Sequence, residues 1–408
     1  MTAQARHAVS PLPALPLDAE AARQTRLLLD LAGQIRAGRL ALQLPDGTRV
    51  PFAGPEPGPE AAVILNRPRL ADRLVADGSL GLADAYLDGD FDTPDLARLL
   101  ELLALNRTSF APVLEEQFAE RMQRRLRGLF RRRNGEPAPA RPALDYGASF
   151  YEAWLDPTLG FGVGLFATGE ERLEVAQWAK FATLGRMIGL KAGQHVLDLD
   201  CGFGAFAAFA AGEIGARVTA LARRPEHEAF ARRRMQALGL ADRVDVRAAG
   251  ERVPAGPFDR VAAIGTLPQL GDAAWPGFLA ELRACLAEGG RAGLETAVLP
   301  DALRDLQRAG NDVLRRDLFP GASLPTARAL AEHARRAGLD LVATESLAGS
   351  AARTLGEWRQ RFVQAWPHLS AQDVEPAARR LWDFALAYGE AALRTGRADV
   401  LLVALGPA

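Results

Sequence analysis

Residues 196–205, Val-Leu-Asp-Leu-Asp-Cys-Gly-Phe-Gly-Ala, have the residue types and spacing of a ligand-binding loop. An apolar strand runs directly into a turn that contains Gly202 and Gly204. Glycine lets a backbone approach a ligand closely, and the first turn of the following helix offers unpaired N–H donors. Asp198, near the end of the strand, is placed to order the turn or to receive a cationic or hydroxylated ligand. The pattern predicts a nucleotide-type binding site.

The elements that must position this loop alternate between strands and helices. Apolar runs predict strands at 195–199, 217–221, 244–247, 259–264 and 291–296. Helical patterns fall between them at 204–214, 225–238 and 275–286, and Gly289 with Gly290 is expected to cap the last of these. Repeated βα units predict a doubly wound, Rossmann-like α/β domain, at 144–408, with its ligand at the carboxyl ends of the strands.

The first part of the chain predicts a separate small domain. Residues 1–17 are rich in Ala and Pro and are expected to form a flexible tail. A helical pattern covers 18–38, and strand-like segments at 40–44 and 61–65 follow it. Further helical segments continue to Leu105, so we expect a small α+β domain at 18–115.

Residues 116–143 are expected to join the two domains through a basic helix and a Pro/Ala-rich linker. Between Arg121 and Arg133 there are seven arginines and no acidic residue. The segment fits a solvated connector helix, and the next alternative is a peripheral contact with anionic lipid headgroups. Nucleic acid is the weaker alternative because no aromatic residues alternate with the basic ones.

Composition sets broad limits on the class of protein. The chain has 408 residues, 49% of them hydrophobic, and a formal net charge of −1, which gives no general attraction to nucleic acid. Its two cysteines, Cys201 and Cys285, suggest neither a disulfide framework nor a zinc site, so no metal is expected. Without a signal-peptide pattern or an apolar run of about 20 residues, a cytoplasmic protein is expected.

Five further segments, in order along the chain, resemble motifs of the cyclopropane-fatty-acyl-phospholipid synthases and the related fatty-acid and mycolic-acid methyltransferases. They are residues 81–89, 146–158, 173–180, 318–321 and 358–367. The similarity extends over nearly all of 70–400. It implies a class I methyltransferase domain that uses S-adenosylmethionine rather than a dinucleotide, preceded by a lipid-associated domain.

The same resemblance implies a reaction. In this family a cis double bond of an unsaturated fatty-acyl chain attacks the sulfonium methyl group, and a base then removes a proton, which gives a cyclopropane or a methylated alkene. An apolar cavity holds the acyl chain. Family members also hold a bicarbonate ion with a Cys, a Glu, a His and a Tyr from four motifs.

Those four bicarbonate positions carry other residues in this chain. Val163 replaces the cysteine, and Leu267–Gln269 replaces the segment that supplies Glu and His. Glu295 replaces a histidine after the fifth strand, and Asp317 replaces the tyrosine. Two new carboxylates would oppose a bound anion. We therefore expect Glu295 as proton acceptor with Asp317 as its partner, or, alternatively, a merely solvated or paired Glu295. The altered base favours a methylated alkene as product.

The cofactor positions implied by the resemblance are partly altered. Matching residues and their neighbours in the expected cofactor site are Gln177, Asp198, Gly202, Gly204, Leu221 and, for the adenine or ribose, Glu251. Asp200 stands where the family has glycine. It could form a salt bridge with the sulfonium or amino group of the cofactor, or it could fill and block the pocket. Cys201 is expected to be a small buried residue rather than a nucleophile.

The leading hypothesis is an S-adenosylmethionine-dependent methyltransferase acting on unsaturated phospholipid acyl chains, peripheral on the inner face of the membrane. It includes no nucleic-acid partner, and it allows a homodimer or a heteromer with a related synthase. The alternative is a catalytically silent homologue that binds lipid or regulates an active synthase. A third hypothesis is a methyltransferase for a small soluble acceptor.

Overall fold

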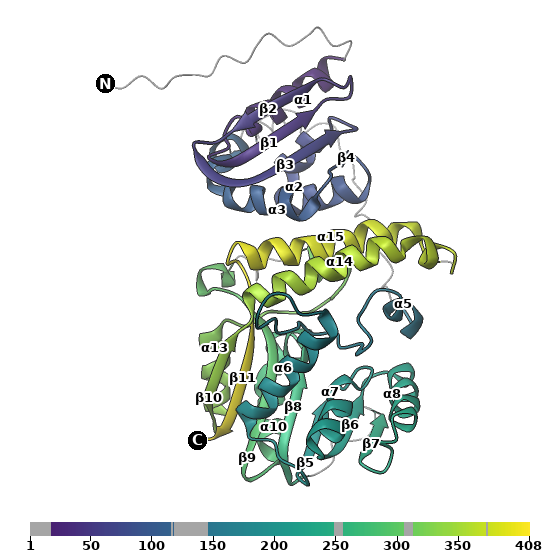
Figure 1. Ribbon diagram of the computed structural model, residues 1–408. Helices are drawn as coiled ribbons and strands as arrows, with labels where there is room; N and C mark the ends of the chain where they lie inside the picture. The colour runs from purple at the N-terminus through teal and green to yellow at the C-terminus, as the bar shows by residue number, and fades with distance from the viewer. Residues whose placement is uncertain (1–17, 116, 118–145, 249–255, 306–312, 373) are drawn as a thin grey trace, which may run out of the picture. The chain divides into compact units, whose positions relative to one another are not determined.

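The computed structural model describes residues 18–115, 117, 146–248, 256–305, 313–372 and 374–408 (Figure 1). The chain divides into two compact units, Met1–Gly135 and Glu136–Ala408. The expected tail at 1–17, the basic segment at 121–133 and Glu251 lie outside the described residues. No helix within the described ranges is both long enough and apolar enough to cross a lipid bilayer.

The first unit combines a four-stranded sheet with helices. Its elements are α1 (Ala19–Ala32), β1 (Ala37–Gln43), β2 (Arg49–Ala53), β3 (Glu56–Leu65), α2 (Leu70–Leu87), β4 (Phe91–Asp92) and α3 (Leu96–Leu105). The strand order is β2-β1-β3-β4, with β1 and β3 parallel and the other pairs antiparallel.

The first helix ends earlier than its sequence pattern predicts. Asp18 caps α1 by accepting a hydrogen bond from the Ala21 amide at 2.7 Å. The helix ends at Ala32 rather than at Gly38, because residues from Ala37 onward belong to β1. The predicted strand at 40–44 is the second half of β1 and the residue that follows it.

The second unit is built on a seven-stranded sheet with the order β10-β11-β9-β8-β5-β6-β7. The strands are β5 (His195–Leu199), β6 (Arg217–Ala222), β7 (Val244–Ala248), β8 (Phe258–Ile264), β9 (Leu286–Val298), β10 (Leu339–Ser346) and β11 (Asp399–Pro407). The five from β5 to β9 run parallel, whereas β11 is antiparallel to both β9 and β10. The strand order reverses beside β5, so its carboxyl end is the expected ligand position.

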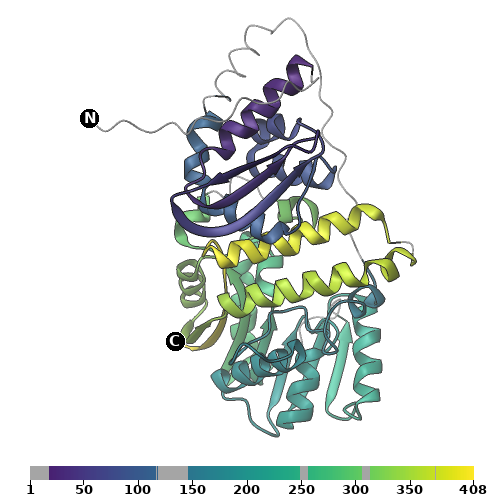
Figure 2. The same cartoon turned by 45° about the horizontal axis from the view of Figure 1, so that its top comes forward.

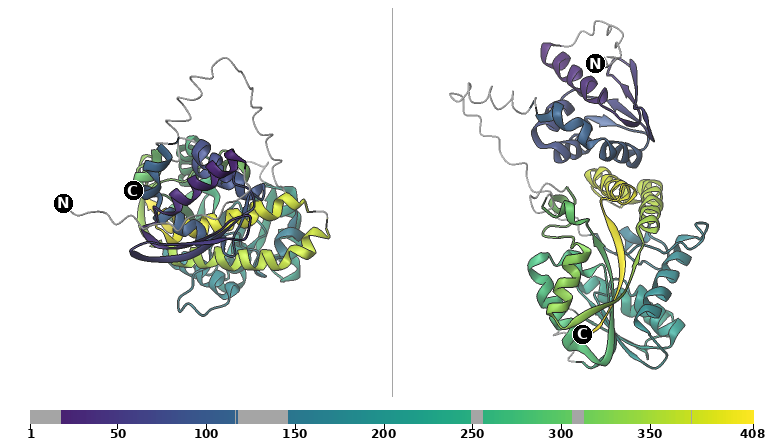
Figure 3. Two further views of the ribbon diagram at one scale, coloured as in Figure 1. Left: turned by 90° about the horizontal axis from the view of Figure 1, so that it is seen from above. Right: turned by 90° about the vertical axis from the view of Figure 1, so that its left-hand side faces the viewer.

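Helices cover both faces of this sheet, as the right-hand view of Figure 3 shows. Side chains alternate along the strands, so Val196 enters one apolar cluster and Leu197 the other. The first cluster contains residues of α6 (Leu173–Ile188), α7 (Ala205–Phe209) and α8 (Pro225–Ala237). The second contains residues of α10 (Trp275–Cys285) and α13 (Ala327–Arg336).

Two long helices, α14 (Ala348–Ser370) and α15 (Pro376–Arg394), run side by side across the carboxyl ends of the parallel strands (Figures 1 and 2). Short helical segments complete the unit: α5 (Ala148–Glu152), α9 (Thr266–Gln269), α12 (Val313–Asp317) and single turns at Asp272–Ala274 and Asp301–Leu303. An apolar cluster joins α14 and α15 to α5 and to the glycine loop after β5.

Two expected helix boundaries differ in the structure. The helix predicted at 204–214 is the short α7, which continues as a π-helical turn over Ala210–Ile214. Gly289 and Gly290 do not cap α10, which ends at Cys285. They lie inside β9, where the pairing with β8 shifts register between Leu286 and Arg291. The two glycines therefore belong to an irregular strand start rather than to a helix end.

Candidate functional site

Asp198 lies in β5 with its carboxyl group buried, since only 1% of the residue is exposed. The amide of Ala207, in α7, hydrogen-bonds to this carboxyl group. Its Oδ2 atom is buried without a hydrogen-bond partner among the described residues. Burial, together with the nearby charge of Asp200, raises the pKa of Asp198 to about 8. A buried oxygen of this kind is available to a donor group of a ligand.

The two glycines of the loop after β5 have different surroundings. Gly202 adopts a φ of +54°, and a Cβ added there would have no other atom within 4 Å. Gly204 adopts a φ of +82°, and a Cβ there would lie 3.0 Å from Met235 Cε in α8. Gly202 therefore exposes backbone to open space, as a ligand requires, whereas Gly204 allows close packing against a helix.

Asp200 adopts a φ of +66°, in the left-handed region that favours glycine. Its Oδ2 atom lies 3.1 Å from Arg223 Nε, just beyond β6. Burial raises the pKa of Asp200, and the charge of Arg223 opposes this shift. The backbone at Asp200 thus has glycine-like geometry, as expected if Asp200 replaces a glycine of the family. Its contact with a cofactor and its blocking of the pocket both stay predictions.

Leu221 and Cys201 connect the glycine loop to the neighbouring strand. The Leu221 carbonyl accepts a hydrogen bond from the Cys201 amide at 2.8 Å, and both residues are buried. Burial and the nearby carboxyl groups raise the pKa of the Cys201 thiol well above its ordinary value. A thiol held protonated is a poor nucleophile, which agrees with the predicted structural role of Cys201.

Gln177, on α6, holds the loop formed by residues 160–164. Its Nε2 atom donates to the Gly160 carbonyl at 3.2 Å and to the Gly162 carbonyl at 2.6 Å. Its Oε1 atom is buried and has no partner in the part of the chain that the structure describes. From α14, Thr354 Oγ1 accepts a hydrogen bond from the Gly164 amide at 3.0 Å. The 160–164 loop is therefore fastened to two helices.

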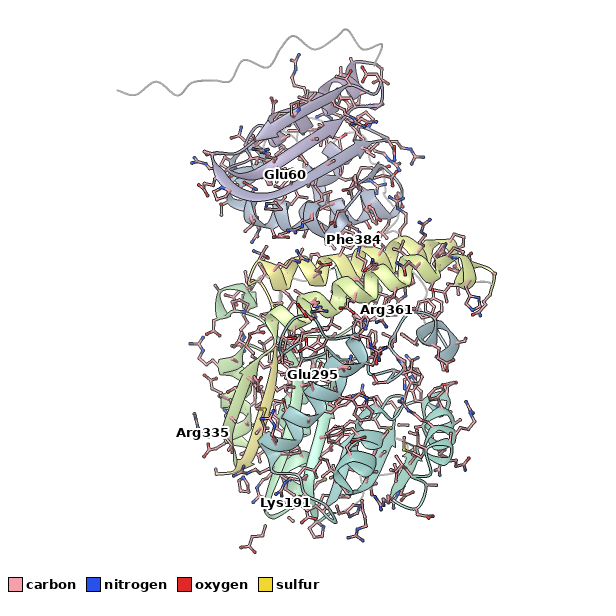
Figure 4. All side chains as sticks on the ribbon, in the orientation of Figure 1. Glu60, Lys191, Glu295, Arg335, Arg361 and Phe384 are labelled. Atoms are coloured by element: carbon pink, nitrogen blue, oxygen red, sulfur yellow. The ribbon has the colours of Figure 1, made fainter. Side chains whose placement is uncertain are left out.

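Glu295, in β9, lies directly against the 160–164 loop and beside α6 (Figure 4). Its Oε1 atom accepts a hydrogen bond from the Val163 amide at 2.8 Å. Its Oε2 atom lies 2.9 Å from Nζ of Lys180, and the two side chains are only 5% and 0% exposed. Of the two interpretations of Glu295, the structure shows the paired carboxylate; a role as proton acceptor stays a prediction.

Asp317 ends the short helix α12 and is also buried. Arg316 contacts both of its carboxylate oxygens, with Nε at 2.8 Å and Nη2 at 2.7 Å. The contacts described for Glu295 are instead with Lys180 and Val163. The expected pairing of Glu295 with Asp317 therefore stays a prediction.

The glycine loop and Glu295 meet at the carboxyl ends of β5, β8 and β9. The Gly265 amide, directly after β8, donates to the Glu295 carbonyl at 2.9 Å. Thr266 Oγ1 donates to the Leu199 carbonyl, at the end of β5, at 3.2 Å. Residues 265 and 266 thus connect the predicted cofactor residues to the predicted proton acceptor.

An aromatic cluster borders both the glycine loop and the 160–164 loop. The Trp154 ring lies 6.0 Å from that of Trp358 and 5.6 Å from that of Trp382, and all three residues are buried. Their indole N–H groups have no acceptor among the described residues. Phe161, of the 160–164 loop, stacks on Trp358 at 5.3 Å and is 42% exposed. Phe203, of the glycine loop, belongs to the same cluster. The cluster is thus an apolar core beside both loops, and Phe161 is its exposed edge.

Arg234, on α8, joins the glycine loop to the segment before the 160–164 loop. Its guanidinium donates to the carbonyls of Pro157, Thr158 and Phe203. Beside it, a groove of about 510 Å³ opens between this segment and α8. The groove is lined by residues of the 152–159 segment and of α8. Neither Asp198 nor Glu295 lines it, so the candidate site is defined by the buried contacts described above and not by this groove.

Sequence patterns did not predict the contacts of Lys180, the Val163 amide, Arg223 and Thr354. One signal for Lys180 was available. It lies three residues after Gln177 and therefore on the same face of α6, within the motif at 173–180. The other three contacts join segments that are distant in the chain or use backbone atoms, and no sequence pattern marks them.

Known proteins share both sequence and fold with this chain. A model of the family described as mycolic acid cyclopropane synthetase matches residues 134–403. The chain is 28% identical over 405 residues to the tuberculostearic acid methyltransferase UfaA1 of Mycobacterium tuberculosis, covering 96% of this chain and 93% of that protein. It is 23% identical over 351 residues to the cyclopropane-fatty-acyl-phospholipid synthase of Escherichia coli K12, covering 85% and 87%.

Among solved structures, the cyclopropane synthase MmaA2 from Mycobacterium tuberculosis aligns with a TM-score of 0.59 at 22% identity. The alignment covers 65% of this chain and 96% of that chain. At this level of identity the likeness concerns the fold. It confirms the doubly wound class I methyltransferase architecture predicted for the second unit.

Proposed function

The chain belongs to the mycolic acid cyclopropane synthetase family, and on this basis we propose that it transfers a methyl or methylene group from S-adenosylmethionine to the double bond of an unsaturated phospholipid acyl chain. The observation that carries the proposal is the position of the glycine loop, which shares Phe203 with a buried aromatic cluster. A nucleotide-type cradle and an apolar wall therefore adjoin each other, as a lipid-modifying methyltransferase requires.

The residues around the glycine loop fit S-adenosylmethionine. The open space at Gly202 leaves backbone free for a ligand. Gln177 Oε1 and Asp198 Oδ2 are both buried and unpartnered among the described residues. The first is an acceptor for a hydroxyl or amino group, and the second becomes one when the carboxyl group of Asp198 loses its proton. Asp200, Gly204 and Leu221 complete the set that would hold the cofactor. When bound, the cofactor supplies an electrophilic methyl group.

The aromatic cluster supports an acyl chain as the acceptor. Trp154, Trp358 and Trp382 give a rigid apolar surface that would exclude water from the reacting carbon atoms. The names of two relatives, a tuberculostearic acid methyltransferase and a cyclopropane-fatty-acyl-phospholipid synthase, point to fatty-acyl substrates as well. Peripheral attachment to a membrane through residues 121–133 is part of the same proposal.

Glu295 is the proposed proton acceptor. Its Oε2 atom is the basic atom that would take a proton from the acyl chain, and the Val163 amide fixes the other oxygen. A buried carboxylate with one oxygen fixed by a backbone N–H group is pre-organised for this task. A methylated alkene is the proposed product, because the proposed base differs from the one that the resemblance implies for the family.

The test uses purified protein, S-adenosylmethionine labelled in its methyl group and vesicles of an unsaturated phospholipid. We expect label in the lipid, none in saturated vesicles, and a methylated alkene separated from the cyclopropane isomer by gas chromatography. Glu295→Gln should bind S-adenosylmethionine as the wild type does in calorimetry and lose transfer by at least about 100-fold.

Two outcomes would contradict the proposal. Transfer of label to a small soluble acceptor, with none to vesicles, would show that the substrate is a small soluble molecule and not a phospholipid. Absence of S-adenosylmethionine binding, with retained association with vesicles, would instead identify a catalytically silent lipid-binding homologue.

A further inference from the structure

Lys180 is a buried cation for which the proposed function gives no task. Its side chain is 0% exposed, and Nζ lies 2.9 Å from Glu295 Oε2. The ring of Phe181 lies 4.5 Å from the same ammonium group. Removing an ammonium group from water is costly, and apolar side chains of similar volume can often replace a buried ion pair without loss of stability. Stability alone therefore gives a weak reason for this pair.

The surroundings of the Glu295 carboxylate have the chemistry of an anion site. The Lys180 ammonium approaches one oxygen and the Val163 amide donates to the other, at 2.9 and 2.8 Å. A cationic side chain combined with a backbone N–H group is a common way for a protein to bind a small oxyanion. Here the ammonium forms an ion pair, and the amide a hydrogen bond, with a carboxylate of the same chain.

Gly162 shows how closely the loop covers this pair. A Cβ added at Gly162 would lie 2.7 Å from each Glu295 carboxylate oxygen and 2.8 Å from Lys180 Nζ. Contacts this short are essentially never seen for real Cβ atoms. The backbone of the 160–164 loop therefore rests directly on the ion pair, and Gln177, one turn before Lys180 on α6, holds the same loop from its carbonyl groups.

We propose that Lys180 and the Val163 amide form an anion-binding site that the chain fills with its own Glu295 carboxylate, and that Lys180 is the positioning residue for this carboxylate. The inference rests on the proposed function only for the role of that carboxylate as proton acceptor. Replacing Glu295 by alanine leaves the ammonium and the N–H group facing a space the size of a small carboxylate, which a formate ion can enter.

The first test measures binding without any reaction. Thermal unfolding of the full chain is followed with sodium formate and, at equal ionic strength, with sodium chloride. For Glu295→Ala, the midpoint should rise by about 3 °C once formate reaches roughly ten times its dissociation constant. Glu295→Gln is the matched control, because its amide fills the same space and leaves no room for formate. The double variant Lys180→Met/Glu295→Ala should also fail to respond.

The second test follows turnover. Formate should restore methyl transfer by Glu295→Ala at least about tenfold, through kcat and with unchanged KM for S-adenosylmethionine, and it should not restore the double variant. Lys180→Met alone should lower kcat and leave the affinity for S-adenosylmethionine unchanged in calorimetry.

The two proposals fail in different ways. An equal formate response of Glu295→Ala and Glu295→Gln, or a response that persists without Lys180, would overturn the anion site. A formate response that depends on Lys180, combined with no methyl transfer by the wild type, would overturn the proposed function and leave the anion site supported.

Discussion

At the scale of single residues, the pKa of Asp198 makes the stability of the chain depend on pH. Burial and the charge of Asp200 raise its pKa from the ordinary 3.8 to about 8. Between these two pH values the folded chain holds a proton that the unfolded chain has released. The free energy of unfolding therefore decreases as the pH rises through this window.

Asp198→Asn should remove this part of the pH dependence. Asparagine keeps the shape of the side chain but does not titrate, so between about pH 4 and pH 8 the variant should lose less stability per pH unit, by at most about 1.4 kcal/mol. Urea unfolding of both proteins, without cofactor, at a series of pH values measures the difference. Parallel curves for the two proteins across this window would show that Asp198 ionises normally.

At Asp200 the property to be tested is the strain of the left-handed backbone conformation. Non-glycine residues in the left-handed region cost of order 1 kcal/mol, and Asp200 has a φ of +66°. Asp200→Gly should therefore be more stable than Asp200→Ala by about 1 kcal/mol, because both variants lose the contact with Arg223 and only alanine keeps the strain. Denaturant unfolding of the two variants gives this difference directly. Equal midpoints would place the strain elsewhere in the loop.

At the scale of elements, the 160–164 loop is positioned by α6, α14 and β9 together. Gln177 binds its carbonyl groups, Thr354 binds the Gly164 amide and Glu295 binds the Val163 amide. Three elements from distant parts of the sequence thus hold one short segment between the glycine loop and the aromatic cluster. The loop's geometry is a property of this arrangement rather than of its own residues.

Thr354→Val should show how much the hydrogen bond between α14 and the 160–164 loop contributes to stability. Thr354 is fully buried, and valine has nearly the same shape but leaves the Gly164 amide without its acceptor. An unsatisfied buried N–H group costs about 1–3 kcal/mol. We expect that loss in unfolding free energy, together with faster hydrogen exchange at Gly164. Thr354→Ser retains the hydroxyl group and should exchange slowly; fast exchange in both variants would mean that the hydroxyl does not hold the loop.

At the scale of the whole molecule, the apolar core of the second unit consists of three clusters, and all of their residues come from that unit. Every buried residue of these clusters lies between Phe150 and Leu405. The domain boundary proposed at residue 144 would keep all of them. A fragment of residues 144–408 should therefore fold and bind S-adenosylmethionine with an affinity close to that of the full chain, as measured by calorimetry. An insoluble fragment, or one that unfolds without cooperativity, would show that the boundary is misplaced.

The sequence predicted the parallel strands well because their apolar runs are short and bounded by turns. The strands at 195–199 and 259–264 were found to within a residue. It did not predict β10 and β11, because the pairing of β10 with β11 and of β11 with β9 depends on contacts between distant segments. Gly289 was misjudged because a glycine after a helical pattern is typical both of a helix cap and of an irregular strand.

In the candidate site, too, residues of consecutive elements were predictable from the sequence and contacts between distant segments were not. Asp198, Gly202 and Gly204 are predictable because strand, turn and helix are consecutive in the chain. Glu295 could be proposed from a resemblance, but its partner Lys180 lies on a helix that precedes the whole sheet, and their contact exists only after folding. Local patterns predict local geometry, and an ion pair across the fold has no local pattern.

The Glu295–Lys180 pair bears on what the protein needs from its surroundings. The resemblance implies that family members hold bicarbonate, a solute in exchange with dissolved carbon dioxide. The base proposed here, Glu295, would instead belong to the polypeptide and be present at one equivalent in every molecule. Turnover in degassed buffer should then equal turnover in air, and the protein's output would follow its substrates alone.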